Sequence, residues 1–313
     1  MPFRNPQQPR PNQTFALLSG LGAAVVGGIT WSTHHLLVAG APGAVPDSGW
    51  PGVLCLLLPV ADDLTLHVAS YAFLLAIGAG LASSVRALVR QQQQTHALLK
   101  ACLARRTRHD RTAQAVARRV GLGGRLDVVD LPTPVAFCYG YLRPRVIVSR
   151  GLVATLPRQQ LAALLLHERE HVRQRDPLKV ALGKLLAAGV FFVPALSALY
   201  RHYLVEKELA ADSAVIRAQG SATSLAAALV VFLERGPAPP PAFSAGADEA
   251  LEARLDSLLG GPIRFRPRIG RIPLLGSATT IALALLPLLL VTPLHEHLVQ
   301  VSGELAAGCH YVL

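Results

Sequence analysis

The stretch from Leu161 to Asp176, LAALLLHEREHVRQRD, constrains this chain more than any other. An apolar run leads into two histidines, His167 and His171, which stand four positions apart. Residues at this spacing share one face of an α-helix. The stretch therefore predicts a helix that presents two imidazoles side by side.

Glu168, which lies between these histidines, suggests that this helix face binds a metal. Glu168 lies about 100° further round the helix than His167. Two imidazoles with an adjacent carboxylate can bind one zinc ion and place a general base beside it. The competing interpretation is a solvated helix that carries two ordinary histidines.

The ends of this helix are also predictable. Thr155 is a candidate N-cap and Pro157 suits the first turn. The helix should stop at Asp176, because a residue that precedes proline avoids helical geometry. Asp176 would then cap the helix that follows.

A zinc ion needs a third protein ligand, and the acidic residues downstream offer one. Glu208 and Asp212 lie four apart in a predicted helix from Leu204 to Arg217 and so share a face. One of the two can ligate the metal while the other orients a histidine through its second nitrogen. Glu206 is expected to face solvent.

Composition and charge suggest a membrane protein. The chain is 51% hydrophobic, with a mean hydropathy of +0.40 and a net charge of +11. Uncharged stretches at 15–39, 68–85 and 272–294 approach the length of a membrane span. Basic residues gather in 86–119, which is typical of a cytoplasmic flank. Direct nucleic-acid binding is disfavoured because no aromatic residues alternate with the basic ones.

The predicted organisation follows from these runs. We expect a basic disordered tail at 1–13, and two transmembrane helices with an extracytoplasmic loop at 14–85. A cytoplasmic domain at 86–271, a transmembrane helix at 272–294 and an extracytoplasmic tail at 295–313 complete the chain. A cleaved signal peptide is the alternative for the first apolar run. Residues 178–200 are predicted to form a hairpin that does not cross the membrane, because both halves of the metal site must lie on one side.

A small β-sheet is predicted ahead of the metal helix, from strands at Arg125–Asp130, Val135–Tyr141 and Arg145–Ser149. An exposed edge strand could pair with an extended peptide, or the sheet could be a simple packing layer. The four cysteines are scattered without a C-x-x-C pair, so neither a zinc knuckle nor a disulfide scaffold is indicated.

The motifs together resemble a known family. The His-Glu-x-x-His motif with Asp176, the later Glu208-Leu-Ala-Ala-Asp212, and the segments 134–140 and 142–149 are similar to BlaR/MecR-type integral membrane zinc metallopeptidases. The resemblance covers roughly residues 115–260. HtpX-type membrane peptidases, which are also gluzincin-like, are the neighbouring family.

The resemblance implies roles for individual residues. It makes His167, His171 and Glu208 ligands of Zn²⁺, Glu168 the catalytic base, and Asp212 a supporting residue. The implied fold is a mainly α membrane protein, with transmembrane helices and a cytoplasmic zincin-like α+β metallopeptidase domain that contains a small sheet.

The implied activity is that of a multi-pass endopeptidase of the cell membrane whose active site faces the cytoplasm. Its substrate would be a cytoplasmic or membrane protein, such as a transcriptional repressor. The chain departs from the antibiotic-sensing members because only residues 295–313 follow the last apolar run, which is too little for a penicillin-binding sensor domain. The alternatives are an HtpX-like quality-control protease and a non-catalytic membrane scaffold with a structural zinc site.

Overall fold

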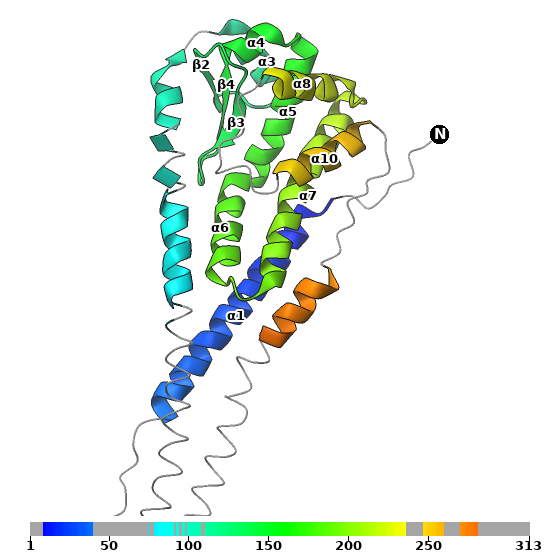
Figure 1. The fold of residues 1–313 in the computed structure, drawn as a ribbon. Helices are drawn as coiled ribbons and strands as arrows, with labels where there is room; N and C mark the ends of the chain where they lie inside the picture. Colours follow the sequence, from blue (N-terminus) through cyan, green and yellow to red (C-terminus); the bar gives the residue numbers. More distant parts are fainter. Residues whose placement is uncertain are drawn as a thin grey trace, which may run out of the picture.

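Figure 1 shows the fold in a computed structural model. The structure describes residues 9–39, 75, 78–90, 92–93, 96–97, 99–107, 110–235, 247–259 and 270–280. These residues are mainly helical, with one small sheet, as the sequence predicted.

The sheet has four strands in the order β1-β2-β4-β3. They are β1 (Arg106–Thr107), β2 (Leu126–Val129), β3 (Ala136–Tyr139) and β4 (Arg145–Ser149). The central strands β2 and β4 are parallel, whereas β3 is antiparallel to β4 with Ala136 opposite Val148. The order makes β3 an edge strand.

Three helices pack against this sheet, and a fourth packs on one of them to complete the main core. The three are α3 (Arg111–Arg119), α4 (Arg150–Thr155) and α5 (Arg158–Gln174), and the fourth is α8 (Thr223–Arg235), which packs on α5. The apolar side of α5 meets the sheet and α8, with Leu165 and Leu225 almost fully buried between them. The core therefore fixes the position of α5, the helix that carries both histidines (Figure 1).

The ends of α5 differ in part from the prediction. Thr155 ends the preceding helix α4 instead of capping α5, and Pro157 takes the N-cap position. At the other end, Arg175 adopts a left-handed conformation with φ 54°, and α6 begins at Asp176. The chain thus turns sharply four residues after the second histidine.

Two long helices follow as a hairpin, α6 (Asp176–Gly189) and α7 (Pro194–Gln219). The N-terminal helix α1 (Pro11–Ala39) packs against both, and α10 (Ala247–Leu258) packs against α7 (Figure 1). Leu18 of α1 is fully buried in this second core, and Gly22 allows the side chain of Leu186 to approach closely. Side chains from distant parts of the sequence therefore surround α7.

The prediction of a transmembrane protein is wrong for the part of the chain that the structure describes. No helix among those residues combines the length and the apolar character that a bilayer crossing needs. In α1, Phe15, Leu18 and Leu21 pack against the α6–α7 core, so part of the uncharged run serves intramolecular packing. The predicted loop at 40–66, the tail at 295–313, half of the run at 68–85 and most of the run at 272–294 lie outside the described residues.

Candidate metal centre

The two histidines of α5 face the helix α7, and a carboxylate of α7 reaches them. The Nε2 atoms of His167 and His171 lie 3.1 Å apart. Glu208 Oε2 lies 3.2 Å from Nε2 of His167 and 3.7 Å from Nε2 of His171. One ligand atom from each of the three residues falls within 4.8 Å of the others. Segments far apart in the sequence thus present three donor atoms to one point.

The opposite nitrogen of each imidazole faces a carboxylate. His171 Nδ1 lies 2.7 Å from Asp176 Oδ2, and Asp176 also accepts a hydrogen bond of 3.0 Å from the Tyr203 hydroxyl. His167 Nδ1 lies 2.8 Å from Asp212 Oδ1, although the contact is too bent for a straight hydrogen bond. Such contacts favour the tautomer with the proton on Nδ1, which leaves the Nε2 lone pair free.

This arrangement fits a divalent cation. Two neutral imidazoles with lone pairs facing each other at 3.1 Å repel unless a proton or a cation lies between them. Both rings are buried, so water screens this repulsion weakly. Two imidazole nitrogens with one carboxylate oxygen suit zinc, and three protein ligands leave a coordination position open.

The charges around the site also hold its carboxylates ionised. Burial would raise the pKa of Glu208, but attraction by Lys207 and His171 brings it well below its ordinary value. Burial would lower the pKa of His171, yet Glu208 and Asp176 raise it to about 10, so without a metal this ring keeps a proton. The site thus retains its anionic ligand at neutral pH.

Two cations complete the surroundings of Glu208. Lys207 Nζ forms an ion pair with Glu208, and Arg254 Nη1 of α10 lies 3.6 Å from Glu208 Oε2. Arg254 also donates two hydrogen bonds to Asp212, at 2.8 Å and 3.0 Å. Burial raises the pKa of Asp212, but Arg254 and then His167 lower it further, so the pKa lies below its ordinary value. Helix α10 thereby secures the carboxylate beside His167.

Glu168 stands beside His167 without a partner of its own. It is buried, with 7% of its surface exposed, and among the described residues it makes no hydrogen bond or ion pair. Helix α5, which carries Glu168, contacts both α7 and β3. A carboxylate that is not held by a partner is free to accept a proton.

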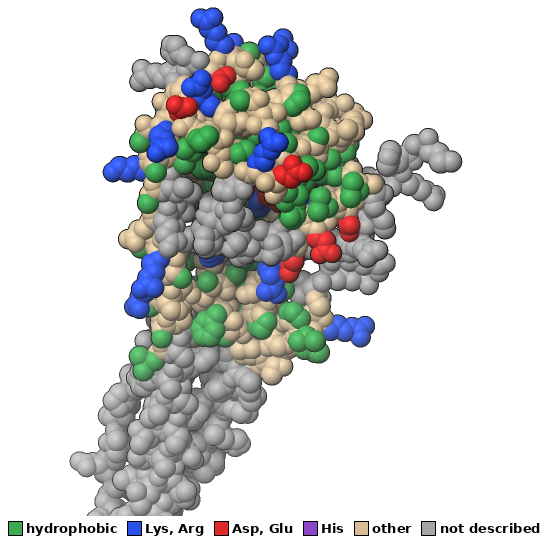
Figure 2. Space-filling view, turned by 45° about the horizontal axis from the view of Figure 1, so that its top comes forward, with side chains coloured by type: hydrophobic (Ala, Val, Ile, Leu, Met, Phe, Trp, Pro, Cys, Tyr) green, Lys and Arg blue, Asp and Glu red, His purple; other side chains and the backbone are tan. Residues whose placement is uncertain are grey.

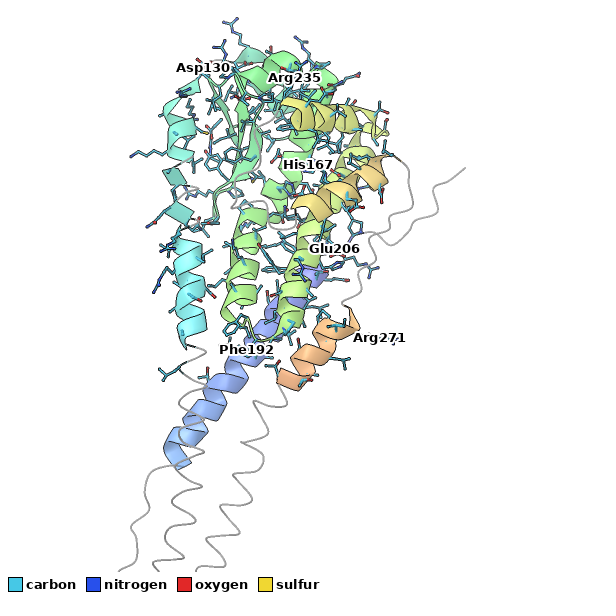
Figure 3. The ribbon with its side chains drawn as sticks, in the orientation of Figure 1. Asp130, His167, Phe192, Glu206, Arg235 and Arg271 are labelled. Atoms are coloured by element: carbon cyan, nitrogen blue, oxygen red, sulfur yellow. The ribbon has the colours of Figure 1, made fainter. Side chains whose placement is uncertain are left out.

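The structure differs from the sequence interpretation at Glu206. This residue was expected to face solvent, but it is buried and accepts a 2.5 Å hydrogen bond from Thr14 of α1. It also pairs with His202 at 3.3 Å. Figure 3 shows Glu206 on α7, below His167 and near the start of α1. Glu206 therefore anchors α1 and lies apart from the metal centre.

Sequence reasoning missed three further groups around the site. Arg254 and Lys207 went unassigned, and Asp176 was interpreted as a helix cap and as part of the family motif, without a contact to His171. The five-residue spacing of His171 and Asp176 across the end of α5 was the one local signal that these two side chains could meet. Nothing local pointed to Arg254, which lies in a separate short helix.

A helix with two converging imidazoles, a carboxylate from a second helix and an unpaired glutamate next to the first histidine define a metallopeptidase-type centre. The family model described as BlaR1 peptidase M56 matches residues 64–258, and the chain belongs to that family. This result confirms the resemblance found in the sequence. A comparison with curated proteins gives no match.

Proposed function

We propose that this protein is a zinc-dependent endopeptidase that hydrolyses peptide bonds in a protein substrate. The observation that carries the proposal is the convergence of His167, His171 and Glu208 within 4.8 Å, with the unpaired carboxylate of Glu168 adjacent in sequence. Membership of a peptidase family supports the same reaction class.

The proposed hydrolysis needs metal ligands and a group that transfers a proton. His167, His171 and Glu208 would hold the zinc ion, which supplies Lewis-acid polarisation of the scissile carbonyl and of the attacking water. Glu168 accepts the proton of that water as the oxygen attacks the carbonyl carbon. Glu168 then returns the proton to the amide nitrogen as the C–N bond breaks.

The edge strand β3 is the proposed docking element for the substrate. Among the described residues, the backbone of β3 pairs only with β4. The strand also contacts α5. Helix α5 carries Glu168 and both histidines, so β3 lies beside the helix of the proposed catalytic groups. An extended polypeptide can pair with such an edge. A regulatory repressor is one candidate substrate.

The second candidate function is a scaffold whose zinc site is structural. A structural site fills all four coordination positions with protein ligands, whereas His167, His171 and Glu208 supply three. Glu168→Gln separates the two functions, because it removes the base and leaves the ligands. Its matched control is Glu234→Gln, on the exposed surface of α8.

We expect Glu168→Gln to bind zinc like the native protein and to lose peptide hydrolysis, whereas Glu234→Gln keeps both. The measurements are zinc content and cleavage of an unstructured protein such as casein. Hydrolysis that survives Glu168→Gln would refute the proposed role of Glu168.

A further inference from the structure

A pocket of about 620 Å³ lies between the end of α5 and the turn that joins β3 to β4. Five of its eight lining residues are arginines and none is acidic: Arg125, Arg143, Arg145, Arg173 and Arg175, with Leu142, Pro144 and Val172. On the face shown in Figure 2, Lys and Arg side chains stand mostly singly or in pairs. Arginines thus make up most of the residues that line this pocket.

Buried carboxylates fix two of these arginines in place. Arg145 donates to both oxygens of Asp127, at 2.6 Å and 3.0 Å, and Asp127 is only 1% exposed. Arg173 donates to both oxygens of Glu170, which is also buried, at 2.9 Å and 2.6 Å. These two walls of the pocket are thus held in a defined position before any ligand arrives.

The other three arginines have no such partner. Within the described residues, Arg125, Arg143 and Arg175 make no ion pair and no side-chain hydrogen bond, and all three are exposed. The pocket therefore carries uncompensated positive charge. Guanidinium groups bind carboxylates through paired, charge-assisted hydrogen bonds, so the matching ligand carries several carboxylates.

The pocket continues the path that a substrate would follow past the metal centre. Val172 directly follows His171 in α5, and Arg175 directly precedes Asp176. The turn with Arg143 follows β3, a strand that contacts α5. A peptide paired with β3 and cleaved at the metal centre would extend towards the arginines on one side.

We propose that this pocket is a substrate subsite that binds the acidic side chains of an extended protein segment, on one side of the scissile bond. The proposal rests on the proposed endopeptidase function. It names a preference for Asp and Glu that the family assignment does not contain.

The test uses the double variant Arg143→Gln with Arg175→Gln in the full chain. Its matched control is Arg119→Gln with Arg158→Gln, which removes the same charge at exposed positions outside the pocket. Binding is measured on the Glu168→Gln background, by fluorescence anisotropy, with labelled unstructured peptides that contain either several glutamates or glutamines at the same positions. Cleavage of the same peptides is measured with Glu168 intact.

We expect the glutamate peptide to bind more tightly than the glutamine peptide, and the preference to weaken as salt rises. Because Arg143 and Arg175 are exposed, loss of their two charge pairs should weaken binding of the glutamate peptide by about tenfold in the pocket variant and leave the control unchanged. The ratio of kcat/KM for the two peptides should fall in parallel.

The outcomes distinguish this proposal from the proposed function. Binding that depends on Arg143 and Arg175, without cleavage by the native protein, would support the subsite and refute the peptidase proposal. Cleavage that ignores peptide charge would overturn the subsite and leave the peptidase proposal standing. The subsite would also be overturned by equal binding of both peptides, or by tight binding of inorganic phosphate without a preference between them.

Discussion

The carboxylates behind the two histidines offer a sharp test of how the metal centre is positioned. Asp212→Asn keeps the size of the side chain and removes its charge. It weakens the contact with His167 Nδ1 and leaves Arg254 with the more distant Glu208, at 3.6 Å. Asp176→Asn is the matched change at His171, because Asp176 contacts Nδ1 of that ring at 2.7 Å.

The two variants should share a loss of zinc affinity and differ in the cation that loses its carboxylate, which is His171 for Asp176→Asn and Arg254 for Asp212→Asn. Loss of a carboxylate that orients a metal-binding histidine costs about 10- to 100-fold in metal affinity, so both should bind zinc more weakly by that factor. Only Asp212 also holds Arg254 through two hydrogen bonds. Breaking a buried charge pair costs about 3–5 kcal/mol, and since asparagine still accepts one bond, we expect Asp212→Asn to lose about 2–3 kcal/mol of unfolding free energy.

Two assays separate these effects. Zinc affinity is measured by competition with a chromophoric chelator, and the unfolding free energy by denaturant titration of the zinc-free proteins. Without zinc His171 keeps a proton, so Asp176→Asn also breaks a buried charge pair and should lose stability too. Native zinc affinity in both variants would refute the orienting role of the carboxylates, and a native unfolding free energy in Asp212→Asn would refute the role of Arg254.

Three further predictions concern the scaffold. Gly151→Ala should lower stability by about 1–3 kcal/mol, measured by denaturant titration, because a Cβ there would lie 1.7 Å from a backbone carbonyl oxygen. Thr14→Val should cost about 1–3 kcal/mol in the same assay, because the buried Glu206 carboxylate loses a donor. Burial raises the pKa of Asp127, but Arg145 and Tyr139 lower it more, so the stability that Asp127 contributes is present above about pH 4 and is lost below it. In thermal melts, the Tm of Asp127→Asn should therefore fall less steeply with decreasing pH than the Tm of the native protein.

Each of these has a control within the chain. Gly28→Ala, in open space on α1, should slightly stabilise the protein, and a Gly151→Ala protein as stable as the native one would contradict the close contact. Thr14→Ser keeps the hydroxyl and should behave like the native protein. Asp130→Asn, at an exposed side chain, should keep the native acid dependence, and an unchanged slope in Asp127→Asn would contradict the assignment.

The local part of the site could be predicted from the sequence because helical spacing is a property of neighbouring residues. The four-residue spacing predicted that His167 and His171 share a face, and the same rule applied to Glu208 and Asp212. The structure brings these helices together, with Glu208 Oε2 at 3.2 Å from His167. Strand positions were also predicted closely, because runs of β-branched residues between turn residues are a local signal.

The rest depends on contacts between distant segments. Arg254 lies 42 positions from Asp212, and no local pattern distinguishes it from the other exposed-looking arginines. Glu206 looked solvated because its partner Thr14 is 192 positions away. The uncharged run in α1 suggested a membrane span because apolar length alone does not distinguish lipid from a helix–helix interface, and Leu18 is buried in the latter.

The central claim is that one zinc ion binds between α5 and α7, and anomalous X-ray scattering at the zinc edge from crystals of the zinc-loaded protein tests it most directly. The account predicts one strong peak within coordinating distance of His167, His171 and Glu208, and its disappearance in Glu208→Ala. A peak elsewhere in the molecule, or one that persists at full strength without Glu208, would contradict it.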